Sequence, residues 1–193
     1  MRKKKIFVGL DFVFILAVFY LIDTQGIFPL AVIAAIVHEL GHLLAMKGSG
    51  AKIEGIYLSA YGAEIKMSAY PMISYRKEIA IALAGPFAGA LLAILLNITG
   101  NDTCILIAGF SMILTLFNLL PATPLDGGRA LKFLALLFFD EIHQEKISKV
   151  GNILSATFLI TLCIVVNIKI AVSPSLCIFC VFVAVSFLKD FFE

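Results

Sequence analysis

The sequence has little charge and few cysteines, and each scarcity excludes a class of protein. Only 15% of the 193 residues are charged, and the formal net charge of +2 is too small to suggest a nucleic-acid partner. The four cysteines include one C-x-x-C pair, Cys177 and Cys180. A zinc ribbon requires a second such pair, so we interpret all four cysteines as small apolar packing residues.

Apolar residues dominate what remains. They make up 61% of the chain, and the mean hydropathy is +1.04. Soluble domains are usually about 45–50% apolar. The composition therefore predicts an all-α polytopic membrane protein that forms one domain over residues 1–193. The basic start Met1–Lys5 precedes an apolar run that no small-residue cleavage site closes, so we expect this run to be a retained span.

Hydropathy and length predict about six transmembrane helices. The expected spans cover residues 6–22, 28–46, 78–97, 104–120, 150–168 and 173–188. Residues 130–139 are apolar but short, which favours a buried or interfacial helix. His143 follows in a polar stretch and is expected to be an exposed surface residue.

Residues 47–76 differ from the rest, because four glycines interrupt them. From Ala63 to Ser68 apolar and polar residues alternate, which is typical of a strand. We predict a small membrane-associated β-hairpin with its turn near Ser59–Gly62. The alternative is an irregular interfacial loop.

The sequence His38-Glu39-Leu40-Gly41-His42 lies within the apolar stretch 28–46. Two histidines four residues apart share one face of a helix and can hold one Zn²⁺. The glutamate beside the first histidine can reach a water on that metal. Ionisable groups inside an apolar helix are costly and usually functional. The alternative is a pair of core histidines with ordinary hydrogen-bond partners, which leaves Glu39 without a role.

Two further stretches belong with this motif. Residues 118–129 carry two prolines and two glycines, which end a helix and place Asp126 on irregular backbone. Asp126 is then a candidate third metal ligand, or else a residue that caps the next helix. Within 78–97, the small residues around Ala84-Gly85-Pro86 predict close packing against the helix that carries the histidines.

The basic residues indicate an orientation. With six spans and the N-terminus inside, all of the 15 lysines and arginines except Lys169 fall on the cytoplasmic side. His38 and His42 then lie in the cytoplasmic half of their helix, and Asp126 lies at similar depth. We expect a multi-pass protein of the bacterial cell membrane, with both termini and the site toward the cytoplasm.

These motifs resemble the site-2 protease family of intramembrane zinc metalloproteases. The resemblance rests on the HELGH motif together with Asn118 and Leu125-Asp126-Gly127-Gly128, and on Ala84-Gly85-Pro86. It covers roughly residues 28–129, which would form a three-helix catalytic core. The short chain looks most like the branch of stage IV sporulation protein FB. That branch usually adds a C-terminal CBS domain, and because this sequence stops at Glu193 we do not expect regulation through such a domain.

The resemblance implies roles for individual residues. His38, His42 and Asp126 would be the zinc ligands and Glu39 the catalytic base. Asn118 would bind substrate backbone, and residues 52–68 would match the family's β-hairpin. The substrate would be a membrane-tethered protein such as a pro-transcription factor, and membrane proteins could act as inhibitory partners.

Two other functions stay open from the sequence. A transporter of divalent metal ions would also place histidines and acids within the membrane, but the chain shows no internal repeat. An inactive membrane scaffold would keep the fold, but it would have no use for an intact Glu39.

Overall fold

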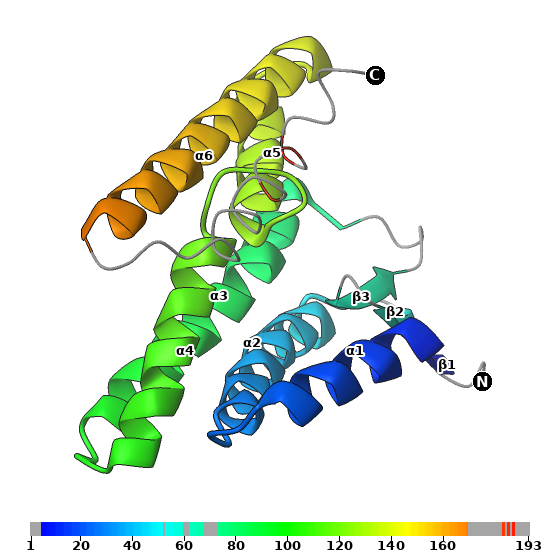
Figure 1. Ribbon diagram of the computed structural model, residues 1–193. Helices are drawn as coiled ribbons and strands as arrows, with labels where there is room; N and C mark the ends of the chain where they lie inside the picture. Colours follow the sequence, from blue (N-terminus) through cyan, green and yellow to red (C-terminus); the bar gives the residue numbers. More distant parts are fainter. Residues whose placement is uncertain are drawn as a thin grey trace. The chain divides into compact units, whose positions relative to one another are not determined.

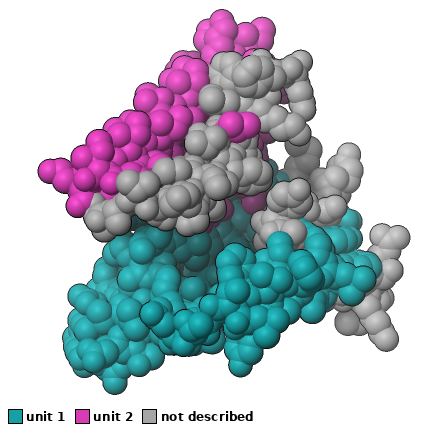
Figure 2. Space-filling model, viewed as in Figure 1, with its two compact units in different colours: residues 1–116 teal, residues 117–193 magenta. Residues whose placement is uncertain are grey.

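The computed structural model describes residues 5–51, 53–59, 62–67 and 73–169, together with Val183, Val185 and Phe187. The chain divides into two compact units, residues 1–116 and residues 117–193 (Figure 2). The expected span over residues 173–188 lies outside the described residues apart from those three positions.

Within its described residues, the first unit contains a three-stranded sheet and four helices (Figure 1). Its elements are β1 (Lys5–Val8), α1 (Leu10–Ile22), α2 (Phe28–Gly48), β2 (Ile53–Ser59), β3 (Gly62–Met67), α3 (Tyr75–Asn97) and α4 (Asp102–Asn118), whose last turn enters the second unit.

Helix α3 is the centre of the first unit, because it packs against both α2 and α4. The backbone of α2 approaches α3 at Gly41, where an added Cβ would collide with the Ala84 carbonyl. On α4, Ser111 Oγ donates to the Gly89 carbonyl at 2.8 Å and Thr115 Oγ1 donates to the Pro86 carbonyl at 3.4 Å. The predicted three-helix core is therefore present, with small residues at its contacts.

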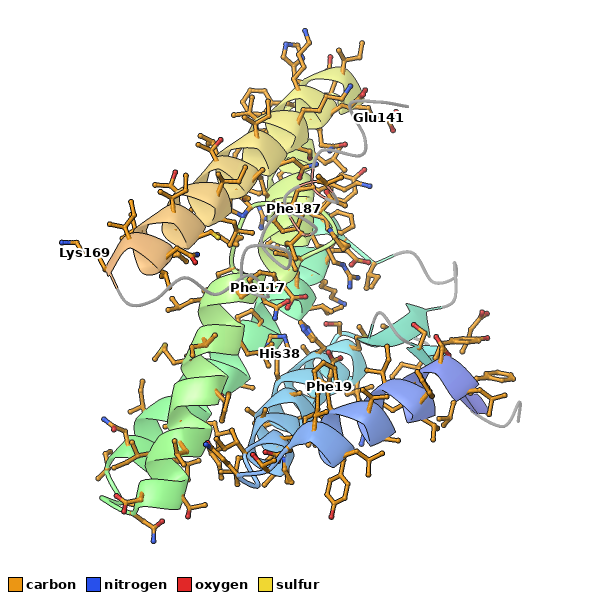
Figure 3. The ribbon with its side chains drawn as sticks, viewed as in Figure 1. Phe19, His38, Phe117, Glu141, Lys169 and Phe187 are labelled. Carbon is orange, nitrogen blue, oxygen red and sulfur yellow. The ribbon has the colours of Figure 1, made fainter. Side chains whose placement is uncertain are left out.

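The second unit contains α5 (Asp126–Phe138) and α6 (Glu141–Lys169), which pack against each other. Its described apolar core consists of Ala122, Ala156, Leu159 and Phe187, the last of which is labelled in Figure 3. Helix α5 confirms the short helix expected near residues 130–139. Helix α6 begins nine residues before the expected start at residue 150, because the polar stretch after Asp140 is also helical.

The predicted hairpin is confirmed and has an additional strand. Strand β2 pairs antiparallel with β3, from Ile53↔Met67 to Ser59↔Gly62. Strand β1 pairs parallel with β2. Across this pair the rings of Phe7 and Tyr57 are stacked, with their centroids 4.9 Å apart. The expected span over residues 6–22 was therefore wrong at its start. Apolar residues at 6–8 suited a strand as well as a helix, and only the distant β2 decided between the two.

Three of the described helices are long and apolar enough to cross a membrane. They are α2, α3 and α6, with 21, 23 and 29 residues, whereas α1 and α4 are shorter apolar helices. A span needs about 20 residues to cross a hydrocarbon core of about 30 Å. The helical membrane fold is confirmed, and three of the six expected spans meet the length requirement within the described ranges.

Both ends of α2 are fixed by local interactions. At the N-terminus the Asp23 carboxylate accepts hydrogen bonds from the N–H groups of Ile27 at 3.0 Å and Phe28 at 2.8 Å. At the C-terminus Gly50 adopts a φ of +78°, and the next N–H donates back to the Met46 carbonyl. This C-terminal pattern needs a left-handed residue, which glycine adopts without strain.

The carboxylate of Asp23 should stabilise the start of α2. Its reduced contact with solvent raises its pKa, but the N–H groups of Ile27, Phe28 and Gln25 lower it further, so the pKa lies below the ordinary value of 3.8. A carboxyl with a lowered pKa contributes stability above its ordinary pKa and loses it as the pH falls through the lowered value. We expect Asp23→Ala to reduce the unfolding midpoint in detergent at neutral pH and to have less effect at strongly acidic pH. Thr24→Ala is the control, and an equal loss in both variants would contradict the role.

Candidate functional site

His38 and His42 lie on the buried face of α2. The buried residues of this helix are Ala34, His38, Gly41, His42 and Met46. Their spacing is that of a single helical face. His38 is only 3% exposed and His42 only 6%. Figure 3 labels the side chain of His38 on this helix. The two imidazoles therefore face protein rather than lipid or solvent.

The ring of His42 has one defined tautomer. Its Nδ1 lies 2.8 Å from the carbonyl oxygen of Ile81 on α3. A carbonyl can only accept, so Nδ1 carries the hydrogen and donates it. In the neutral ring Nε2 then carries a lone pair instead of a hydrogen, which is the form a metal ligand requires. Metal-binding histidines are typically held in this way by a carbonyl or carboxylate.

The Nε2 atoms of His38 and His42 are 3.3 Å apart. Two nitrogens bound at about 2.0–2.1 Å to one tetrahedral Zn²⁺ would lie about 3.3–3.4 Å apart. The same distance also suits a hydrogen bond from His38 to His42. The pair therefore fits a shared zinc ion in separation and in burial, and His42 also fits it in tautomer.

Helix α3 leaves room for the His42 ring because Gly85 has no side chain at the point where the ring lies against this helix. A Cβ on Gly85 would collide with the His42 ring at Nε2, and a Cβ on Gly41 would collide with the α3 backbone at Ala84. The prediction that Ala84-Gly85-Pro86 packs against the histidine helix is confirmed. The sequence reasoning did not find Ile81, since a backbone acceptor leaves no trace in residue type.

Glu39 lies between the two histidines in the sequence and is half-buried on the same helix. It is therefore within one helical turn of both imidazoles. An acidic group inside an apolar helix is costly and usually functional, so the role expected of Glu39 stays a prediction at this position.

Asp126 and Asn118 belong to the second unit, and both are half-buried. Asn118 is the last residue of α4 and Asp126 is the first residue of α5, so Asp126 begins a helix instead of lying on the irregular backbone that was expected. The N-cap position of α5 is occupied by Leu125. Both alternatives for Asp126, metal ligand and helix cap, stay predictions. A carboxylate in the first turn of a helix is favoured by the helix dipole.

His143 is separate from these residues. Its side chain is 62% exposed, and its Nδ1 lies 2.6 Å from a carboxylate oxygen of Asp140. The backbone N–H and the ring of His143 lower the pKa of the Asp140 carboxyl. The prediction that His143 is an exposed surface residue is confirmed.

The sequence matches a known protein family. The profile of Peptidase family M50 matches residues 26–103 and 97–162, which include all of the candidate site residues. A zinc metalloprotease of Methanocaldococcus jannaschii is 32% identical over 144 residues, which are 69% of this chain and 42% of that protein. Stage IV sporulation protein FB of Bacillus subtilis is 28% identical over 163 residues, which are 81% of this chain and 55% of that protein.

A solved structure has the same fold. The site-2 protease from Methanocaldococcus jannaschii superposes with a TM-score of 0.64 over 96% of this chain and 89% of that chain, at 23% identity. This chain spans about half the length of the two relatives described above.

The contact between Gly85 and His42 can be tested by adding one methyl group. Gly85→Ala forces the His42 ring or helix α3 to move, and overpacking of this kind costs about 1–3 kcal/mol. The measurement is the free energy of unfolding in detergent. Gly109→Ala on α4 is the matched control, because its Cβ would meet nothing within 4 Å and alanine is the better helix former. Equal stability of the two variants would rule out the close contact.

Proposed function

The chain belongs to peptidase family M50, and on this basis we propose that it is an intramembrane zinc metalloprotease. It would hydrolyse a peptide bond in or near a transmembrane segment of a membrane-tethered protein. The observation that carries the proposal is the pair of buried Nε2 atoms 3.3 Å apart within a helix long enough to span a membrane. A family match over both motifs supports it.

We assign the zinc ligands to His38, His42 and Asp126. Together they offer two imidazole nitrogens and a carboxylate oxygen, which are donors that zinc prefers. The helix dipole of α5 favours the ionised carboxylate that a ligand must present. Three protein ligands leave one coordination position open, as in other catalytic zinc sites.

Each remaining residue has a distinct role in the proposed reaction. When bound, zinc acts as a Lewis acid on the substrate carbonyl and makes an attacking water more acidic. Glu39 takes the proton of that water and later gives it to the leaving amine. Asn118 donates its amide N–H to a substrate carbonyl or to the developing oxyanion.

The substrate must expose a carbonyl, so a helical segment has to unwind before attack. An unwound segment can pair with the edge of a sheet through its backbone. Strand β2 is already paired on both sides, with β1 and β3. The outer edges of β1 and β3 have no strand partner among the described residues. We therefore expect the substrate to add at one of these edges and not beside β2.

The orientation follows the basic residues. We propose that both termini and the site face the cytoplasm of a bacterial cell, because this orientation places all basic residues except Lys169 on that side. The similarity to stage IV sporulation protein FB favours that branch. A membrane-tethered pro-transcription factor is then the expected substrate, and inhibitory membrane proteins are the expected partners.

The alternative function, transport of divalent metal ions, has no support in the match to a peptidase family or in the relative from Methanocaldococcus jannaschii, which is named as a zinc metalloprotease. Zinc that stays bound during turnover is expected of the protease, whereas zinc flux into vesicles is expected of a transporter.

Glu39→Gln should retain zinc and lose cleavage. The amide cannot accept a proton, and general acid–base catalysis usually contributes about 10²–10⁴-fold to the rate. The measurement compares membrane proteomes of cells that contain the wild type or Glu39→Gln, with zinc content determined on the purified proteins. Substrates are proteins shortened only with the wild type. The control is Glu141→Gln, an exposed glutamate at the start of α6. Wild-type cleavage by Glu39→Gln would show that Glu39 is not the base.

Asp126→Asn should bind zinc more weakly than the wild type. The loss should exceed the roughly 10–100-fold that is typical of losing an outer-shell partner, because a charged ligand is removed. Zinc affinity is measured by competition with a chelator in detergent. Asp102→Asn, an exposed aspartate at the start of α4, is the control. If both variants hold zinc as tightly as the wild type, Asp126 is not a ligand.

A further inference from the structure

One buried side chain of α6 holds the irregular segment that precedes Asp126. Asn152 is 2% exposed, and its Oδ1 accepts a hydrogen bond from the Thr123 N–H at 2.9 Å. Thr123 lies in the segment between α4 and α5, three residues before Asp126 and 29 residues from Asn152 in the chain. This backbone N–H lies outside any regular element, so Asn152 supplies a partner that helix or sheet would otherwise provide.

The same face of α6 packs against the segment along two further turns. Gly151 has no room for a Cβ, which would collide with the Pro121 carbonyl. Ala122 is completely buried in a cluster with Ala156 and Leu159, which Phe187 completes (Figure 3). Polar and apolar contacts from α6 therefore fix successive residues of the segment.

The first turn of α5 also packs closely against the segment. A Cβ on Gly127 would collide with the Leu119 carbonyl, and a Cβ on Gly128 would collide with the backbone of Ala122. Both glycines directly follow Asp126. The segment is thus in contact both with α6 and with the α5 turn that carries Asp126.

We propose that Asn152 is a positioning residue for the metal site, acting through the Thr123 N–H on Asp126. The inference rests on the assignment of Asp126 as a zinc ligand under the proposed function. A metal ligand must be held close to its bonding geometry by neighbours that do not touch the metal. Helices position their own side chains, but an irregular segment depends on such outside contacts. Asn152 supplies this contact from an element that carries none of the proposed ligands.

The test replaces the amide of Asn152 by groups of similar size. Asn152→Leu removes the acceptor and should weaken zinc binding roughly tenfold, the lower end of outer-shell effects. Asn152→Asp keeps an oxygen at the same position and should retain most of the affinity. Zinc affinity is measured by chelator competition on the full chain in detergent, and the cleavage rate is measured with limiting and with saturating zinc. Saturating zinc should restore the rate of Asn152→Leu with the KM unchanged, which a general loss of structure would not allow.

Ser155→Ala is the matched control. Ser155 is 1% exposed on the same face of α6, and its hydroxyl has no hydrogen-bond partner within the part of the chain that the structure describes. Its removal should leave zinc affinity unchanged. If Asn152→Leu does not fold, the same comparison is made with Asn152→Ala.

The outcomes separate the two proposals. Purified wild type that binds no zinc would overturn the proposed function itself. Wild type that binds zinc, with Asn152→Leu binding it equally tightly, would overturn only the positioning role. If Asn152→Asp loses as much zinc affinity as Asn152→Leu, the positioning role is also overturned, because the side-chain oxygen that accepts the hydrogen bond would then have no effect.

Discussion

The hydrogen bond from His42 Nδ1 to the Ile81 carbonyl is the interaction on which the candidate site depends. It fixes which ring nitrogen carries the hydrogen, and so leaves Nε2 as a lone pair directed toward His38. It also joins α2 to α3, the two long helices of the first unit. Formation of the bond and close packing of the two helices therefore require each other.

That mutual requirement explains the small residues of α3. A ring nitrogen can reach a backbone carbonyl of the neighbouring helix only if the two helices approach closely. Gly41 and Gly85 remove the side chains that would keep them apart. In a membrane, such packing replaces the hydrophobic driving force that lipid cannot supply between helices. The hydrogen bond to Ile81 and the packing of α2 on α3 thus both require small residues where the two helices meet.

Local patterns in the sequence were sufficient to predict the parts of the structure that local patterns determine. The i, i+4 spacing of His38 and His42 required only a helix, and the alternation after Ala63 required only a strand. The strand β1 and the acceptor Ile81 could not be predicted in this way. Each depends on a partner about 40 or more residues away, and apolar residue types do not specify that partner. The early start of α6 could not be predicted, because the spans were placed by hydropathy and the first turns of this helix are polar.

The two parts of the proposed ligand set are held by different physical means. The histidines are positioned by helix geometry, which is regular and needs no help beyond the bond to Ile81. Asp126 follows an irregular segment, and irregular backbone is stable in an apolar protein only when other groups satisfy its polar atoms. On this account α6 has a function even though it carries no proposed ligand. Its buried Asn152, which accepts a hydrogen bond from the Thr123 N–H, would give α5 a fixed starting point after a segment that contains Pro121 and Pro124.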